Sequence, residues 1–126
     1  MTPVLIFAIV AMLVAATIYT IAVFGERTAG TLKPSHVALF WTGLVFDTTG
    51  TTLMTRIAGG WQWDVHMVLG MAAIALMLLH SLWATGALVF KQERVLHGFH
   101  TFSVHVWALW MVALVSGVVL VAVRGV

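Results

Sequence analysis

The sequence contains no cysteine and very little charge. Without cysteine the chain forms no disulfide, provides no thiolate ligand to haem iron and holds no thiolate-bound iron–sulfur cluster. Only 8% of its 126 residues are charged, and the formal net charge is +2. Such a small excess does not make a nucleic-acid-binding surface, so we expect no nucleic-acid partner. The sequence also lacks a phosphate-binding loop and a paired nucleophile and base, which disfavours a hydrolytic site.

Apolar side chains are abundant instead. Hydrophobic residues make up 62% of the chain, and the mean hydropathy is +1.08. A soluble domain of this size has no core large enough to absorb so much apolar surface. The composition therefore predicts an integral membrane protein with the lipid bilayer as its partner.

Four hydrophobic runs are long enough to span a bilayer, at about 3–24, 36–54, 65–90 and 97–123. The first run has no basic residues before it, so we interpret it as a retained span. Backbone groups in lipid must be satisfied within their own segment, which predicts helices, and short connections make neighbours antiparallel. The prediction is an all-α, up-down four-helix membrane bundle forming a single domain over residues 1–126.

The basic residues predict the orientation. Connections one and three carry Arg27, Lys33, Lys91 and Arg94, and the opposite side carries Arg56 and Arg124. The positive-inside rule then places these two connections in the cytoplasm and both termini outside. Trp61 and Trp63, in connection two, predict an interfacial aromatic anchor.

Two of the six histidines lie within one apolar span. His66 and His80 are fourteen residues apart, which brings them within about 40° of one helix face and about 21 Å apart along the axis. An imidazole in hydrocarbon is costly, so it indicates a functional role. The natural partner of inward-facing histidines in a membrane bundle is haem iron.

Antiparallel hairpins allow the depth of each histidine to be compared. Folding the spans back places His36, His80, His100 and His105 within about two helical turns, in the half nearest connections one and three. His100 and His105 point about 140° apart, and we favour His100 as the inward one. A haem b between His80 and either His100 or His36 would have its propionates near a group of basic residues, Arg27, Lys33, Lys91 and Arg94.

Small residues share the faces of His36 and His80. They leave room for a flat porphyrin, or they allow helices to pack closely. His66 lies in the other half of the bundle, where a second haem would have only Met12, Met54 or Asp47 as its other ligand. Asp47 is a costly carboxylate near the middle of its span. We expect it about one turn from His66, either orienting that ring or relaying protons, unless the neighbouring threonines satisfy it.

Three stretches resemble a known family. HVALFWTGLVFDTTGTTLM, HMVLGMAAIALMLLHSLWA and FHTFSVHVWALWMVALVSG are similar to the heme-sensing membrane protein A (HsmA-like) family of small four-span bacterial membrane proteins. FDTTGTT is the most specific element. The resemblance implies haem binding in the bacterial cytoplasmic (inner) membrane and protection against haem toxicity and oxidative stress. Carried over by position, the implied haem ligands are His36, His66, His80 and His100, with Asp47 in the shared motif.

The leading hypothesis is therefore a haem-b-binding membrane protein that sequesters haem or uses it in redox protection. The alternative is a b-type membrane cytochrome enzyme that passes electrons between quinol or superoxide and an acceptor, with quinone as a partner. The fourteen-residue spacing favours two stacked haems, but no second span repeats it: Gly50 lies fourteen beyond His36, and Leu114 fourteen beyond His100. One haem is thus better supported than two. A third hypothesis is a haem-free proton or ion carrier.

Overall fold

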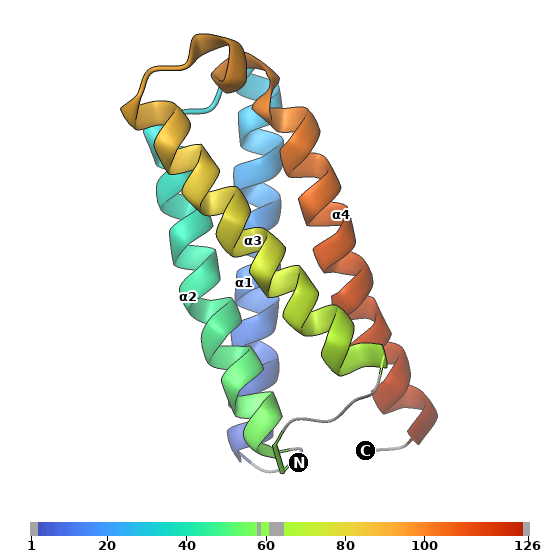
Figure 1. The fold of residues 1–126 in the computed structure, drawn as a ribbon. Coiled ribbons are helices and arrows are strands. Elements are labelled where there is room, and N and C mark those ends of the chain that lie inside the picture. Colours follow the sequence, from blue (N-terminus) through green and yellow to red (C-terminus); the bar gives the residue numbers. More distant parts are fainter. Residues whose placement is uncertain (1–2, 58, 61–64, 125–126) are drawn as a thin grey trace.

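The computed structural model describes residues 3–57, 59–60 and 65–124 and folds them into four helices. These are α1 (Pro3–Ala29), α2 (Pro34–Ile57), α3 (Val65–Val89) and α4 (Glu93–Arg124). The described residues contain no strand, so the all-α class is confirmed. Consecutive helices run in opposite directions and lie side by side (Figure 1).

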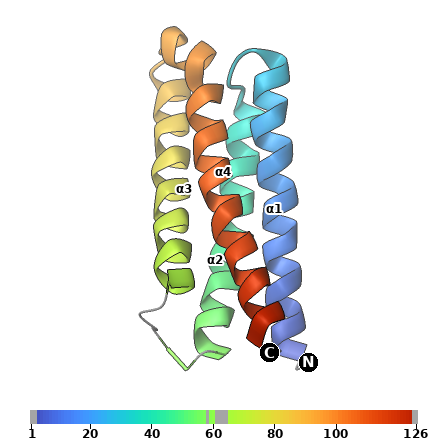
Figure 2. The same cartoon turned by 90° about the vertical axis from the view of Figure 1, so that its right-hand side faces the viewer.

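The helices form two hairpins. Helix α1 packs most extensively on α2, and α3 on α4, whereas the contacts of α2 with α3 and of α1 with α4 are smaller. The start of α1 and the end of α4 lie at one end of the molecule, and the α1–α2 and α3–α4 connections lie at the other (Figure 2). The two connected ends are joined by a backbone hydrogen bond from Leu32 N–H to the Leu96 carbonyl, at 3.1 Å.

Proline and glycine mark the first helix boundaries. Helices α1 and α2 both begin at a proline, whose fixed φ suits the first helical position. Gly30 follows the end of α1 with φ of +74°, a conformation that glycine adopts without strain, and its N–H bonds the Glu26 carbonyl at 3.0 Å. At the start of α2, Lys33 N–H donates to His36 Nδ1 at 3.0 Å, which satisfies a free amide as a capping box does.

Helix α1 continues past the predicted end of its span. The prediction ended the span at residue 24 and assigned Glu26 to a connection, but the structure buries Glu26 completely within α1. The reason is a single inward face with three- and four-residue spacing, which ends at Glu26. Its members are Ala8, Ala11, Ala15, Tyr19, Ala22 and Glu26.

Three helices are long and apolar enough to cross a membrane: Pro3–Ala29, His66–Val89 and Gly98–Val119, with mean hydropathies of 2.6, 2.0 and 1.9. Large apolar side chains are exposed on their outward faces, among them Phe7, Leu79 and Val112. Apolar surface of this extent suits contact with lipid. The chain is therefore a membrane protein by length and composition. Helix α2 does not reach the same combination of length, hydropathy and low charge.

Side chains of α1 fill the space beside two glycines of α2. A Cβ at Gly43 would lie 2.6 Å from Tyr19 Cε1, and one at Gly50 would lie 2.5 Å from Met12 Sδ. Of the two interpretations of these small residues, the structure thus supports close helix packing and leaves no room for a porphyrin at either glycine. The predicted aromatic anchor, Trp61 and Trp63, lies outside the described residues.

We expect Gly43→Ala to destabilise the α1–α2 hairpin by about 1 to 3 kcal/mol, because the added methyl group overlaps the Tyr19 ring. Gly86→Ala is the matched control, since a Cβ there meets nothing within 4 Å. Thermal unfolding of both variants in the same detergent measures the difference. Equal stability of the two variants would contradict the packing described here.

Candidate functional site

Buried or partly buried polar side chains occur at three successive depths of the bundle. We name them the His80 cluster (His80, Ser103, Glu26), the Asp47 cluster (Asp47, Tyr19, Trp110, Thr51) and the His66 pair (His66, Ser116). Along α4 their members Ser103, Trp110 and Ser116 are spaced by about 10 and 9 Å. The His80 cluster is nearest the connections α1–α2 and α3–α4.

The His80 cluster joins three helices. His80 on α3 is fully buried, and its Nε2 lies 2.7 Å from the Ser103 hydroxyl on α4. That hydroxyl donates to Glu26 Oε2 on α1 at 3.0 Å. The fourth helix contributes Phe40, whose ring meets the imidazole edge-on with centroids 4.3 Å apart. All four helices therefore enclose His80.

One nitrogen of His80 has no hydrogen-bond partner. Because the Ser103 hydroxyl donates to Glu26, its oxygen accepts the Nε2–H of His80. The neutral imidazole then keeps a bare lone pair on Nδ1. Among the described residues, the buried atoms without a partner are this Nδ1, Glu26 Oε1 and Ser81 Oγ. Buried polar atoms are usually bonded, so these three indicate water or a ligand.

His36 is placed differently from His80. Its Nδ1 accepts the Lys33 N–H, and its Nε2 faces α1, where a Cβ at Gly25 would be 3.4 Å away. The ring therefore caps α2 and packs between α1 and α2. It shares no hydrogen bond with the His80 cluster, although Phe40, one turn further along α2, contacts His80.

The remaining candidate histidines lie on α4. His100 is half-buried beside the buried Phe99, whereas His105 is exposed and its Nδ1 lies 2.6 Å from its own helix's Thr101 carbonyl. This agrees with the choice of His100 as the inward-facing one. The side chain of His97 lies outside the described part of the structure.

The predicted partners of the propionates are exposed and belong to the segments around the α1–α2 and α3–α4 connections. They are Arg27 at the end of α1, Lys33 before α2, Lys91 before α4 and Arg94 in the first turn of α4. Their cationic heads are free to meet anionic groups near the membrane surface.

Asp47 does not pair with His66, contrary to expectation. Asp47 is buried on α2, and its Oδ2 accepts hydrogen bonds from Tyr19 O–H at 3.0 Å and Trp110 Nε1–H at 2.8 Å. His66 instead lies 3.0 Å from the Ser116 hydroxyl through Nδ1 and packs against Gly117. Hairpin folding estimates depth but not direction, and Asp47 points toward α1 and α4.

The threonines satisfy Asp47 only in part. Thr51 donates to Oδ1 at a long 3.4 Å, while the Thr49 hydroxyl donates to the Val45 carbonyl of its own helix. The sequence analysis did not identify the other two donors to Asp47, Tyr19 and Trp110. Their rings contact each other edge-on, with centroids 5.0 Å apart. Their signal was spacing: Tyr19 lies on the alanine face of α1, and Trp110 lies seven residues after Ser103.

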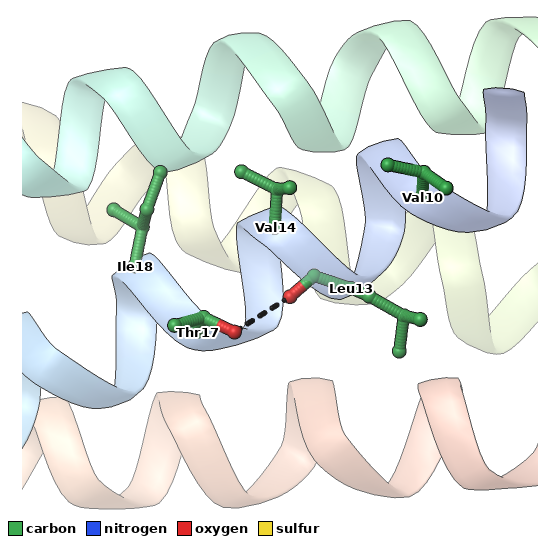
Figure 3. A pocket seen from close by; sticks show the side chains of 5 residues that line it. All are labelled: Val10, Leu13, Val14, Thr17 and Ile18. Atoms are coloured by element: carbon green, nitrogen blue, oxygen red, sulfur yellow. Dashed lines mark hydrogen bonds between the residues drawn. The ribbon is translucent and has the colours of Figure 1, made fainter.

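Neither of two shallow pockets on the described part of the surface is lined by a histidine. The first lies on the outside of α1 (Figure 3), and its one polar side chain, Thr17, donates to the Leu13 carbonyl at 2.9 Å. It is an apolar hollow suited to lipid. The second is a groove between α2 and α3, considered below. The described residues also contain no group of three His, Cys, Asp or Glu placed to bind a metal ion.

Comparisons with known proteins add no further evidence. No protein-family model matches the chain, and searches of curated proteins and of solved structures find no significant similarity. The resemblance to the HsmA-like family therefore stays a prediction.

We expect Ser103→Ala to destabilise the protein by about 1 to 3 kcal/mol, since it leaves both His80 Nε2 and Glu26 Oε2 buried without partners. Thr42→Ala is the control, because that hydroxyl is exposed and donates within its own helix. Chemical or thermal unfolding in detergent measures the stability of both variants. If Ser103→Ala were as stable as the control, this would contradict the role of Ser103 as the link between His80 and Glu26.

Proposed function

We propose that the chain binds haem b in the bacterial cytoplasmic membrane and that His80 supplies an axial ligand. One observation carries the proposal: His80 is fully buried at the meeting point of four helices, and one of its ring nitrogens has no partner. A neutral imidazole with a free lone pair is the form that ligates iron.

Three phenylalanine rings surround the His80 imidazole that is proposed as the axial ligand. Phe40, Phe99 and Phe102 have ring centroids 4.3, 5.0 and 5.7 Å from that of His80, and aromatic walls suit a flat apolar macrocycle. The same rings fill the space around the histidine, so a porphyrin enters only if they move apart. The smaller contacts between the two hairpins make their interface the place where such movement costs least.

The other proposed ligands follow from their predicted depth and from the resemblance, and not from contacts. His100 and His36 remain the alternatives for a second imidazole, and His66 would serve a second haem in the other half of the bundle. Arg27, Lys33 and Arg94 are the exposed cations proposed to pair with propionates, and Asp47 lies in the motif that carries the resemblance. When bound, haem would supply one-electron chemistry or be held in sequestered form, as protection against haem and oxidative stress requires.

We further propose that all four helices cross the membrane as one domain with both termini outside. Helix α2 has 24 residues, which gives a length of about 36 Å, and lies antiparallel between α1 and α3. Its exposed side chains include Val45 and Phe46, which suit lipid. The buried Asp47 lowers its hydropathy but faces the bundle interior, where the other helices satisfy it.

Absorption spectra test haem binding. We expect the detergent-purified protein to show a Soret band and, after dithionite reduction, sharp α and β bands if two histidines ligate the iron. His80→Ala should lose this spectrum and regain part of it with added imidazole, whereas His105→Ala, on an exposed face, should keep it. A wild-type protein that stays colourless with added haem, or an unchanged spectrum in His80→Ala, would contradict the proposal. Rapid reduction by a quinol or superoxide would instead favour the cytochrome enzyme.

Single-cysteine labelling tests the topology, because the natural chain has no cysteine to give background. We expect a membrane-impermeant maleimide to label Lys33→Cys and Glu93→Cys from the cytoplasmic side and Arg56→Cys from the other side. All three positions are exposed in the structure. Labelling of Lys33→Cys and Arg56→Cys from the same side would show that α2 does not cross.

A further inference from the structure

The Asp47 carboxylate lies in the middle of the bundle with only neutral donors around it. Tyr19 comes from α1, Trp110 from α4 and Thr51 from α2 itself. No described Lys or Arg forms an ion pair with it, and α3 contributes no hydrogen bond to it. An intramembrane carboxylate without a cation is costly and is a default candidate for proton transfer.

The two oxygens of Asp47 are unequally satisfied. Oδ2 accepts two hydrogen bonds, at 3.0 Å from Tyr19 and 2.8 Å from Trp110. Oδ1 accepts only the 3.4 Å contact from Thr51, although a carboxylate oxygen accommodates two good donors. The open hydrogen-bonding capacity of Asp47 is thus on the side of Thr51.

Thr51 connects this weakly bonded oxygen with a groove. The groove lies between α2 and α3 and has a volume of about 370 Å³, several times the liquid volume of a water molecule. It is lined by Thr48, Thr51, Thr52, Thr55, Arg56, Met71 and Ile74. Four threonines of α2, from Thr48 to Thr55, line the groove, and Arg56 follows them near the end of the helix that lies on the same side as the start of α1 and the end of α4 (Figure 1).

We propose that Asp47 is a proton-accepting site that exchanges protons, through Thr51 and the α2–α3 groove, with the side of the membrane where the termini lie. A hydrated proton in the groove protonates the Thr51 oxygen as the Thr51 O–H proton passes to Oδ1. The products are a neutral carboxylic acid and a water molecule, with Thr51 restored. Tyr19 and Trp110 keep donating to Oδ2 and hold the acid in place.

This site is separate from the histidines. His66 is bonded to Ser116, and His80 is bonded to Ser103 in the cluster about 10 Å further along the bundle. From α3, the groove is lined by Met71 and Ile74, which do not titrate. The proposal therefore does not depend on haem and holds with or without it.

Infrared difference spectroscopy of the full chain in lipid vesicles tests it. We expect acidification to produce a carboxylic-acid C=O band of Asp47 that shifts in D₂O and is missing in Asp47→Asn, whereas any band of the buried Glu26 remains in that variant. Tyr19→Phe removes one donor to Asp47 and should shift the Asp47 band. It gives a second readout if Asp47→Asn does not fold.

The path through the groove has its own test. Thr51→Val should slow the deuterium shift of the band about tenfold, since the hydroxyl link to Oδ1 is lost. Thr49→Val is the matched control, because the Thr49 hydroxyl is exposed and donates to the Val45 carbonyl. Acid bands identical in Asp47→Asn and in the wild type would overturn the site, and equal exchange in the two threonine variants would overturn the path.

Discussion

The arrangement depends on one requirement: polar groups inside an apolar bundle must find their partners on neighbouring helices. Asp47 is the clearest case, because its carboxylate receives Tyr19 from α1 and Trp110 from α4. These bonds lock the rotation of α2 against two other helices. In a low-dielectric interior, breaking either one leaves a poorly satisfied carboxylate, so the polar contacts specify how the helices face each other.

Close packing of α1 on α2 makes this contact geometrically accessible. Tyr19 reaches Asp47 from a position against Gly43, one turn earlier on α2, where any side chain would collide with its ring. Met12 occupies the corresponding space at Gly50. The small residues of α2 therefore leave space for side chains from α1. The α1–α2 hairpin that results is packed more tightly than the interface between the two hairpins.

Sequence patterns predicted the helices well and the partners poorly. Long apolar runs identified all four helices, because a helix satisfies its own backbone hydrogen bonds in apolar surroundings, and three of the four are long and apolar enough to cross a membrane. Glu26 was misplaced in a connection because its charge was weighed more heavily than its position on the alanine face of α1. Antiparallel folding placed Asp47 near His66 in depth, but the rotation of each helix about its axis decided that they do not meet.

The sequence by itself determined the class of the protein, since composition and the length of apolar runs need no knowledge of packing. It also determined that His80 and Asp47 are buried in apolar surroundings. Only the tertiary structure decided their partners: Ser103 for His80, Glu26 for Ser103 in turn, and Tyr19 and Trp110 for Asp47. The physical reason is that these pairs are separated by 23 to 77 residues in the chain. Their contact depends on the rotation and offset of whole helices, which no local spacing encodes.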